Sequence, residues 1–274
     1  MIDLSSSNSP PVALTIAGSD PSGGAGIQRD LCTFHSLHCI GTSVITALTA
    51  QNSKEVTGVY PISPECIEAQ LKTLYIDLYP HAAKTGMLHS HECICTVHEH
   101  LPQDIPLIVD PVMVSTSGHA LLDPDSIDTL IDLLLPRASI VTPNIPEAEL
   151  LSGVKISTEE TMHQAGDAIL DLGAAYVLVK GGHSTSNKTH SVDILISKEG
   201  AMSLKKKRFP YDVHGSGCLL SAAITAYFAH GISITEACRH AKEFSADAIA
   251  HAVSGSCGVQ MPGSWGKNQY LRKL

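Results

Sequence analysis

VALTIAGSDPSGGAG, residues 12–26, joins an apolar run to a glycine-rich turn. Residues 12–17 are apolar and rich in β-formers, which predicts a buried strand. Beyond the turn, Ile27, Leu31 and Phe34 recur at helical spacing and predict a helix. Strand, glycine turn and helix in succession are typical of a ligand site at the carboxyl edge of a parallel sheet. The turn matches neither common nucleotide loop, so the pattern alone leaves a plain tight turn open.

A second glycine-rich turn, DVHGSGC at residues 212–218, runs into the apolar segment 219–224. The N–H groups of such a turn and the positive end of the following helix form a trap for an anion, most often a phosphate. The same field would favour a thiolate, so we expect the pKa of Cys218 to be lowered and its sulfur to act as a base or nucleophile. The turn therefore suggests phosphoryl transfer near Cys218.

Composition limits the class of protein. The chain has 274 residues and is 43% hydrophobic, which predicts one large domain over residues 12–274 behind a frayed or disordered tail at 1–11. A net charge of −9 argues against a nucleic-acid partner. No apolar run approaches the roughly 18 residues of a membrane helix. Eight irregularly spaced cysteines are typical of free thiols in the cytosol, so we expect a cytoplasmic protein.

Strand and helix patterns alternate along the rest of the chain. Strands are predicted at residues 42–49, 107–112, 139–142 and 176–180, and a short strand is predicted to end near residues 84–87. Residues 192–196 and a segment after Gly200 predict an edge hairpin. Helices are predicted at residues 64–74, 90–100, 124–135, from 143, from a Ser157/Glu160 capping box to Leu172, at 218–230 and at 235–251. This alternation predicts an α/β protein with a mostly parallel central sheet covered on both faces, a three-layer αβα sandwich.

Polar or flexible residues recur where the predicted strands end. Because the carboxyl ends of parallel strands share one edge, we expect these residues to line a common cleft. They are Gly18, Gln51, Lys84, Asp110, Asn144 and Lys180.

Several segments, in order over residues 12–250, carry a family resemblance: residues 13–28, 43–52, 84–88, 109–113, 141–149, 179–183 and 214–218. On these segments the chain resembles the hydroxymethylpyrimidine/phosphomethylpyrimidine kinases of thiamine biosynthesis, in the ribokinase-like superfamily. The resemblance implies a ribokinase-like fold and a homodimer. It also implies ATP- and Mg²⁺-dependent phosphorylation of a small pyrimidine alcohol, 4-amino-5-hydroxymethyl-2-methylpyrimidine, and then of its monophosphate.

At the substrate end, the resemblance implies that Asp30 and Gln51 bind the aminopyrimidine, which suits a carboxylate acceptor and a carboxamide. Gly18, Met87 and Val112 match positions that approach or sandwich the flat ring. Without the resemblance, Met87 and Val112 would be core residues and Asp30 a solvated acid in the first helix.

At the phosphate end, the resemblance implies that Gly215, Ser216, Gly217 and Cys218 hold the transferring phosphoryl group, with Cys218 as the base. Lys180 resembles the lysine that neutralises phosphate charge. Asn144 and Glu147 match a motif that positions magnesium, partly through water, and a helix N-cap with a first-turn acid is an equally open reading. Asp110 would lie near the metal and the phosphates, which makes Asp110 and Glu147 the expected metal ligands.

Three positions depart from the family pattern. Val213 stands where threonine is common and Asp212 where asparagine is usual, next to the expected nucleotide, and Ser216 replaces the commoner threonine without an expected effect. A pyridoxal/pyridoxine kinase of vitamin B6 salvage on the same scaffold is the main alternative. A thiol hydrolase pairing Cys218 with His214 or His183, and a non-catalytic binding module, are further alternatives. Histidines and cysteines crowd residues 89–100, and His91 and Cys95 have a spacing that can bind a metal on a helix, but no second ligand pair has a diagnostic spacing, so we do not predict a metal site there. The run from Lys205 to Arg208 indicates a solvated strand end near the nucleotide.

Overall fold

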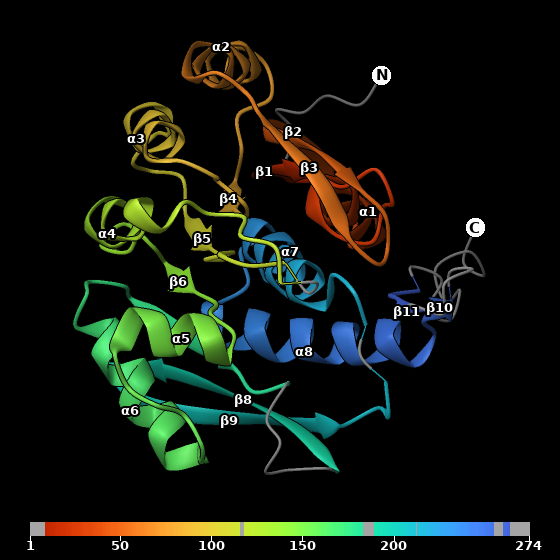
Figure 1. Ribbon diagram of the computed structural model, residues 1–274, viewed down its shortest axis with the longest axis vertical. Helices are drawn as coiled ribbons and strands as arrows, with labels where there is room; N and C mark the ends of the chain where they lie inside the picture. The colour runs from red at the N-terminus through yellow and green to blue at the C-terminus, as the bar shows by residue number, and fades with distance from the viewer. Residues whose placement is uncertain (1–8, 116–117, 183–188, 212, 255–259, 264–274) are drawn as a thin grey trace.

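The computed structural model describes residues 9–115, 118–182, 189–211, 213–254 and 260–263 (Figure 1). Within these residues, nine strands form one sheet in the order β3-β2-β1-β4-β5-β6-β7-β8-β9, and β10 and β11 form a separate ribbon. The strands are β1 (Val12–Ser19), β2 (Ile40–Gln51), β3 (Val56–Pro61), β4 (Ala82–Thr85), β5 (Leu107–Val109), β6 (Ile140–Val141), β7 (Tyr176–Lys180), β8 (His190–Ser197), β9 (Gly200–Lys207), β10 (Val253–Ser254) and β11 (Gln260–Met261).

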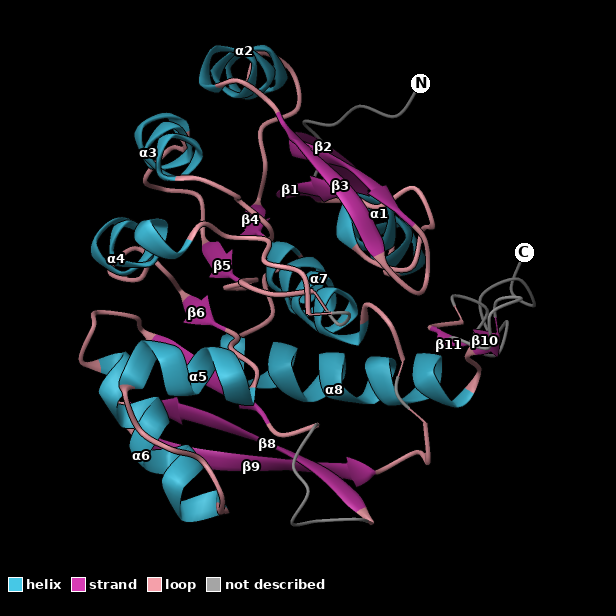
Figure 2. Cartoon of the chain, in the orientation of Figure 1, coloured by secondary structure: helices cyan, strands magenta, loops and turns pink. Residues whose placement is uncertain are grey.

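Helices connect the strands and cover both faces of the sheet. They are α1 (Gly26–Ser36), α2 (Pro64–Leu74), α3 (His91–His100), α4 (Ile127–Thr129) with the flanking turns η1 (Pro124–Ser126) and η2 (Leu130–Leu134), α5 (Ile145–Ser152), α6 (Glu159–Leu170), α7 (Ser216–Ala229) and α8 (Ile234–Ala250). The helices α2 to α6 lie on one side of the sheet, and α1, α7 and α8 lie on the other (Figure 2). Each side has its own buried core, so the predicted three-layer sandwich is confirmed.

The central strands run parallel. β1 pairs with β2 on one side and β4 on the other, and β4, β5, β6 and β7 continue the parallel order. Only β3 and the hairpin β8–β9 pair antiparallel within this sheet of described residues. The predicted mostly parallel sheet and edge hairpin are thus confirmed. The chain leaves β1 toward β2 and later returns to β4, so the carboxyl end of β1 lies at a switch point where open α/β sheets bind ligands.

Helix caps explain most of the observed boundaries. α2 spans the predicted residues because Ser63 Oγ accepts from Cys66 N at 3.4 Å and Pro64 occupies the first helical position. The predicted Ser157/Glu160 capping box is wrong. Thr158 Oγ1 accepts from Thr161 N at 3.2 Å, and Thr161 Oγ1 accepts from Thr158 N at 3.0 Å, so two hydroxyls close the box one residue later.

Some strands are shorter than predicted. The strand predicted at residues 107–112 ends at Val109, because Asp110 O accepts from Val112 N at 2.8 Å in a tight turn around Pro111. The strand predicted at 139–142 keeps only Ile140–Val141. One helix, α7, is longer than predicted at its start, because it begins at Ser216 rather than Cys218.

The division of the chain at residue 12 stays a prediction, and residues 1–8 of the predicted tail lie outside the described ranges. None of the helices in the described part of the chain combines the length and apolar character that crossing a membrane requires.

Candidate active site

The carboxyl edge of the sheet carries a pocket with a cavity volume of about 270 Å³. All six residues predicted at strand ends line it: Gly18, Gln51, Lys84, Asp110, Asn144 and Lys180. The remaining predicted site residues, Asp30, Met87, Val112, Glu147, Gly215, Ser216, Gly217 and Cys218, line the same pocket. The structure therefore brings every predicted site residue to one cavity, whereas the role of each stays a prediction.

Asp30 of α1 lies at the floor of the pocket. Its side chain is fully buried, and its Oδ2 accepts from Thr15 Oγ1 at 2.6 Å and from Lys84 Nζ at 2.8 Å. The reading of Asp30 as a solvated helix acid is therefore wrong. Its other oxygen, Oδ1, has no hydrogen-bond partner among the described residues. A buried carboxylate oxygen without a partner is costly, and an N–H donor on a ligand in the pocket would satisfy it.

The ion pair between Asp30 and Lys84 was missed at the sequence level, although Lys84 was one of the polar strand ends. Both side chains are fully shielded from solvent. Burial alone would lower the pKa of Lys84, but the neighbouring Asp30 carboxylate raises it, so the ammonium keeps its proton. Burial also raises the pKa of Asp30, and the Lys84 ammonium and the hydrogen bond from Thr15 oppose that rise. The pocket floor therefore holds a buried, hydrogen-bonded Asp30–Lys84 pair.

Apolar side chains form a wall of the pocket. Met87 packs in a small buried cluster with Ala47 and Leu121, and the partly buried Val112 contacts that cluster. A Cβ at Gly18 would lie 2.9 Å from Met87 Sδ, so glycine leaves the room that Met87 occupies. The core reading of Met87 and Val112 and their place beside a ring are compatible, because both side chains pack in the cluster and line the pocket.

The two glycine-rich turns pack against each other. Gly215 has a φ of +76°, and a Cβ there would lie 1.9 Å from the backbone oxygen of Gly24. Ser216 N donates to Val213 O at 3.3 Å, so this amide is already used. Gly217 and Cys218 follow in the first turn of α7, where a helix has no carbonyl acceptors for its N–H groups. The amides of Gly217 and Cys218 are therefore the donors best placed to bind an anion.

We expect Gly215→Ala to lower the free energy of unfolding by about 2–4 kcal/mol, from a left-handed backbone and a clash with a backbone atom. Gly231→Ala is the matched control, since Gly231 has a φ of +78° and nothing lies within 4 Å of its added Cβ. The control should cost only about 1–2 kcal/mol. Urea unfolding measures both variants, and equal losses would contradict the packing of the two turns.

The thiol of Cys218 lies in a crowded, charged setting. Burial raises the pKa of this thiol to about 11, and the Lys84 ammonium and a hydrogen bond from Gly26 N oppose that rise only in part. The expectation of a lowered pKa is therefore wrong. The helix terminus and one cation do not offset the loss of water and the nearby carboxylates of Asp30 and Asp110.

This raised pKa predicts slow alkylation of Cys218 in the ligand-free protein, because only the thiolate reacts. Its rate with iodoacetamide should rise about tenfold per pH unit from pH 7 to 10, since ionisation is incomplete throughout that range. Peptide mass spectrometry measures this rate beside that of the exposed Cys32 in the same sample. A plateau in the Cys218 rate below pH 9 would contradict the prediction.

Asp110, Lys180 and Glu147 form the charged end of the pocket. Asp110 Oδ1 accepts from Lys180 Nζ at 2.8 Å, and its Oδ2 accepts from Ser221 Oγ at 2.9 Å. Burial alone would lower the pKa of Lys180, but the Asp110 and Glu147 carboxylates raise it. A cation held between carboxylates at a strand end is well placed to meet phosphate oxygens.

Asn144 and Glu147 form a reciprocal capping box at the start of α5. Asn144 Oδ1 accepts from Glu147 N at 2.9 Å, and Glu147 Oε2 accepts from Asn144 N at 2.8 Å. The helix-cap reading is thus confirmed. Burial raises the pKa of Glu147 to about 7, and Asp110 adds to the rise. The donor set fits Mg²⁺, because it offers carboxylate oxygens whose crowding a divalent cation would relieve.

A third region of the pocket is basic and aromatic. Lys206 and Lys207 at the end of β9 and Arg208 directly after it line this region, and their place near a nucleotide stays a prediction. The rings of Phe209 and Tyr211 follow, with centroids 5.8 Å apart. Val213 is buried here, whereas Asp212 lies outside the described residues.

Lys242 of α8 lies at the same end of the pocket and was not predicted. Its Nζ donates to Asp193 Oδ2 at 2.6 Å, and Asp193 Oδ1 accepts from Gly181 N at 3.0 Å. This pair holds the turn that follows Lys180.

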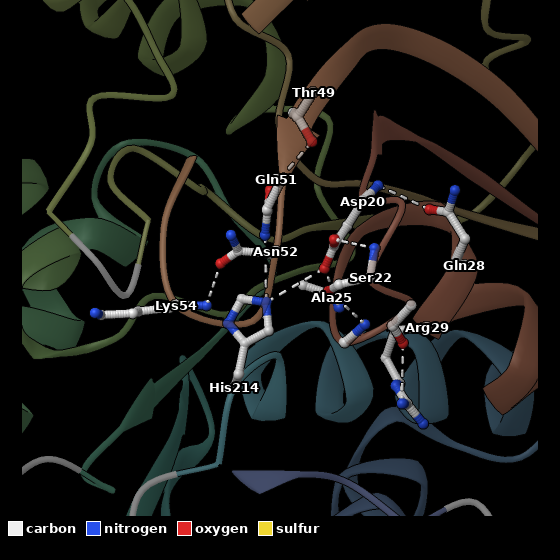
Figure 3. Close-up of polar contacts among 12 residues, drawn as sticks. Asp20, Ser22, Ala25, Gln28, Arg29, Thr49, Gln51, Asn52, Lys54 and His214 are labelled. Atoms are coloured by element: carbon white, nitrogen blue, oxygen red, sulfur yellow. Dashed lines mark hydrogen bonds and ion pairs between the residues drawn. The ribbon is translucent and has the colours of Figure 1, made fainter. Parts of the chain in front are cut away.

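The remaining sequence-level features are the histidines and cysteines of residues 89–100 and the two histidines of the thiol hydrolase alternative, of which His214 lines the pocket. His91 Nε2 is 3.5 Å from Cys95 Sγ, but no group of three or more histidine, cysteine, aspartate or glutamate side chains in the described ranges could hold a metal ion. His183, one partner of the thiol hydrolase alternative, falls outside the described residues. His214, the other partner, contacts Asp20 and Gln51 (Figure 3). This link was missed because Asp20 and His214 are far apart in the sequence.

Known proteins similar to this chain are kinases. The phosphomethylpyrimidine kinase family model matches residues 20–261. A hydroxymethylpyrimidine/phosphomethylpyrimidine kinase of Synechococcus elongatus is 45% identical over 249 residues, which is 89% of this chain and 93% of the relative. The structure is similar to a phosphomethylpyrimidine kinase from Clostridium difficile 630, with a TM-score of 0.76, 44% identity and coverage of 87% and 99%. It is also similar to a Staphylococcus aureus pyridoxal kinase in complex with AMP-PCP and pyridoxal, with a TM-score of 0.86, 36% identity and coverage of 96% of each chain.

Proposed function

The chain belongs to the phosphomethylpyrimidine kinase family, and we propose that it transfers the γ-phosphoryl group of ATP to 4-amino-5-hydroxymethyl-2-methylpyrimidine and then to the monophosphate, in thiamine biosynthesis. The observation that carries this proposal is the unpartnered Oδ1 of buried Asp30, which lines the pocket beside an apolar wall. An exocyclic amine on a flat ring would donate to that oxygen. Among the described residues at this end of the pocket, Asp30 Oδ1 is the buried side-chain acceptor without a hydrogen-bond partner.

The phosphate end supports the transfer step. The first-turn amides of α7 would stabilise charge on the transferring group, and Lys180 would neutralise its oxygens. Cys218 lies at the same turn, where its thiolate would accept the proton of the substrate hydroxyl. Asp30, Lys180 and Cys218 all line the one pocket, so a ring alcohol bound at Asp30 would have its hydroxyl group within the same cavity as the base and the phosphate.

Magnesium completes the proposed chemistry. Asp110 and Glu147 would hold Mg²⁺, partly through water because both carboxylates already accept hydrogen bonds from protein groups. When bound, the ion would screen the negative charge of the phosphates. The proposal also includes a homodimer, as the family resemblance implies, and a cytoplasmic location, as the irregularly spaced cysteines indicate.

A pyridoxal kinase is the second candidate. The solved Staphylococcus aureus enzyme is similar over almost the whole chain, so the scaffold alone does not choose between the two alcohols. The identity of the substrate depends on the polar groups that face the ring.

The test is ADP release with ATP and Mg²⁺, using hydroxymethylpyrimidine, its monophosphate and pyridoxal in parallel. Turnover of both pyrimidines above pyridoxal is the expected result. Preferred turnover of pyridoxal would move the assignment to vitamin B6 salvage. No turnover of any of the three would overturn the proposed function.

A further inference from the structure

The imidazole of His214, from the second glycine-rich turn, faces Asp20 of the first turn and Gln51 at the end of β2 (Figure 3). Its Nε2 is 3.2 Å from Asp20 Oδ2 and 3.3 Å from the amide nitrogen of Gln51. The ring is buried and packs closely on the first glycine turn, since a Cβ at Gly24 would lie 2.5 Å from its Cδ2. His214 is therefore held in place by packing on one side and polar contacts on the other.

The Asp20 carboxylate determines which ring nitrogen of His214 carries a hydrogen. Its Oδ1 accepts from Ser22 N at 2.9 Å, and its Oδ2 accepts from Ala25 N at 2.8 Å. Burial raises the pKa of Asp20, but the hydrogen bonds from His214, Ser22 and Ala25 together lower it below its ordinary value. An ionised carboxylate only accepts hydrogen bonds, so His214 Nε2 must carry a hydrogen and donate it to Asp20.

That hydrogen conflicts with an amide nitrogen at Gln51. A protonated Nε2 has no lone pair in the ring plane, so it cannot accept from the Gln51 NH₂ group. On the other side of the amide, Gln51 Oε1 is 3.2 Å from Thr49 Oγ1, whose single hydrogen goes to Ser19 O at 2.8 Å. The amide nitrogen of Gln51 therefore faces a hydrogen-bond donor at His214, and its amide oxygen faces an acceptor at Thr49.

One change resolves both conflicts. A half-turn of the carboxamide exchanges its oxygen and nitrogen, which have nearly the same shape. The oxygen then shares the His214 Nε2–H with Asp20 Oδ2, as the second acceptor of a three-centre hydrogen bond. The nitrogen donates one hydrogen to Thr49 Oγ1. The second hydrogen of the amide is left for the pocket that Gln51 lines.

We infer that His214 is a positioning residue that fixes the Gln51 carboxamide with its oxygen toward the imidazole and an N–H toward the pocket. The orientation follows from the contacts of His214 and Gln51 and from the ionised Asp20 carboxylate. Its consequence for the substrate rests on the proposed function. Gln51 then offers a donor to a ring nitrogen, while Asp30 Oδ1 offers an acceptor to an amine. The site thereby suits a ring with an amine and an unprotonated nitrogen, and opposes a ring that carries an N–H, such as the zwitterionic form of pyridoxal.

The tautomer of His214 gives a direct test that needs no ligand and no activity. Two-bond ¹⁵N–¹H spectra of the imidazoles distinguish a hydrogen on Nε2 from one on Nδ1. The His214 signal is assigned by its loss in His214→Phe, or in His214→Gln should the first variant fail to fold. A hydrogen on Nε2 is the expected result. A neutral ring with its hydrogen on Nδ1 would overturn the inference whatever the enzyme phosphorylates.

Binding measurements test the effect on the ring. We expect His214→Phe to raise the Kd of hydroxymethylpyrimidine about tenfold, or about 1.4 kcal/mol, while the KM of ATP stays within about twofold. His240→Phe is the control and should change neither value, because His240 is a half-buried residue of α8 that is not among the residues lining the pocket.

Analogues of hydroxymethylpyrimidine with one ring nitrogen replaced by C–H allow a double-mutant cycle between the ligand and His214. In the wild type, the analogue lacking the contacted nitrogen should bind about tenfold more weakly, and in His214→Phe this penalty should shrink to about threefold or less. An equal penalty in both proteins would overturn the role of His214. A wild type that binds no pyrimidine would instead overturn the proposed function and leave the tautomer result standing.

Discussion

Cys218→Ala should lower kcat with hydroxymethylpyrimidine by about 10²–10⁴-fold, the usual contribution of a positioned general base. The Kd of the pyrimidine should change by about twofold or less, because the predicted ring contacts are made by Asp30, Gln51 and the apolar wall. Steady-state kinetics and calorimetry measure the two quantities separately. A variant with near-normal kcat would remove Cys218 from the chemistry.

The pH profile supplies the control for this prediction. Only the thiolate can accept the substrate proton, and burial raises the pKa of the Cys218 thiol to about 11. The kcat of the wild type should therefore rise with pH through pH 9, whereas the residual activity of Cys218→Ala should not follow that rise. Parallel profiles in the two proteins would assign the titration to another group.

Lys84→Met should lower the free energy of unfolding by about 3–5 kcal/mol, the usual cost of leaving a buried charge without its partner. Asp30 would keep only its hydrogen bond from Thr15, at 2.6 Å. Methionine has nearly the length of lysine, so little of the loss comes from packing. Urea unfolding gives the value, and a loss below about 1 kcal/mol would show that the Asp30–Lys84 pair is not a buried ion pair.

Two further variants separate charge from shape. Asp30→Asn with Lys84→Met removes both charges, and this double variant should be more stable than Lys84→Met alone, because no unpaired charge remains. Lys72→Met breaks an exposed pair with Glu68 on α2 and should cost about 0.5 kcal/mol or less. If the buried and exposed variants lose the same stability, burial does not set the strength of the pair.

The sequence could predict the layers and the position of the site because both follow from local patterns. Apolar runs and capped amphipathic segments marked the strands and helices, and the shared edge of parallel strands placed Gly18, Lys84 and Lys180 together before any contact was known. The Asn144/Glu147 box was predictable for the same reason, since its two residues are three apart.

The partners inside the site were not predictable in this way. Lys84 and Asp30 are 54 residues apart, and His214 and Asp20 are 194 apart, so no local pattern joins either pair. The prediction of a lowered pKa for Cys218 was wrong for a related reason. The helix terminus is visible in the sequence, whereas the loss of water around the thiol depends on where the strands and α1 pack against α7.

The central place of β1 has a consequence for how the chain is made. Val12 N donates to His81 Nδ1 across 69 residues, and the parallel pairing with β4 starts at Ala13 and Ala82. A ribosome adds about 5–20 residues each second, so one edge of this buried apolar strand waits about 4–14 s for the segment that covers it. During that interval the nascent chain exposes an unpaired strand edge, which makes early synthesis the stage at which binding by a chaperone would matter most.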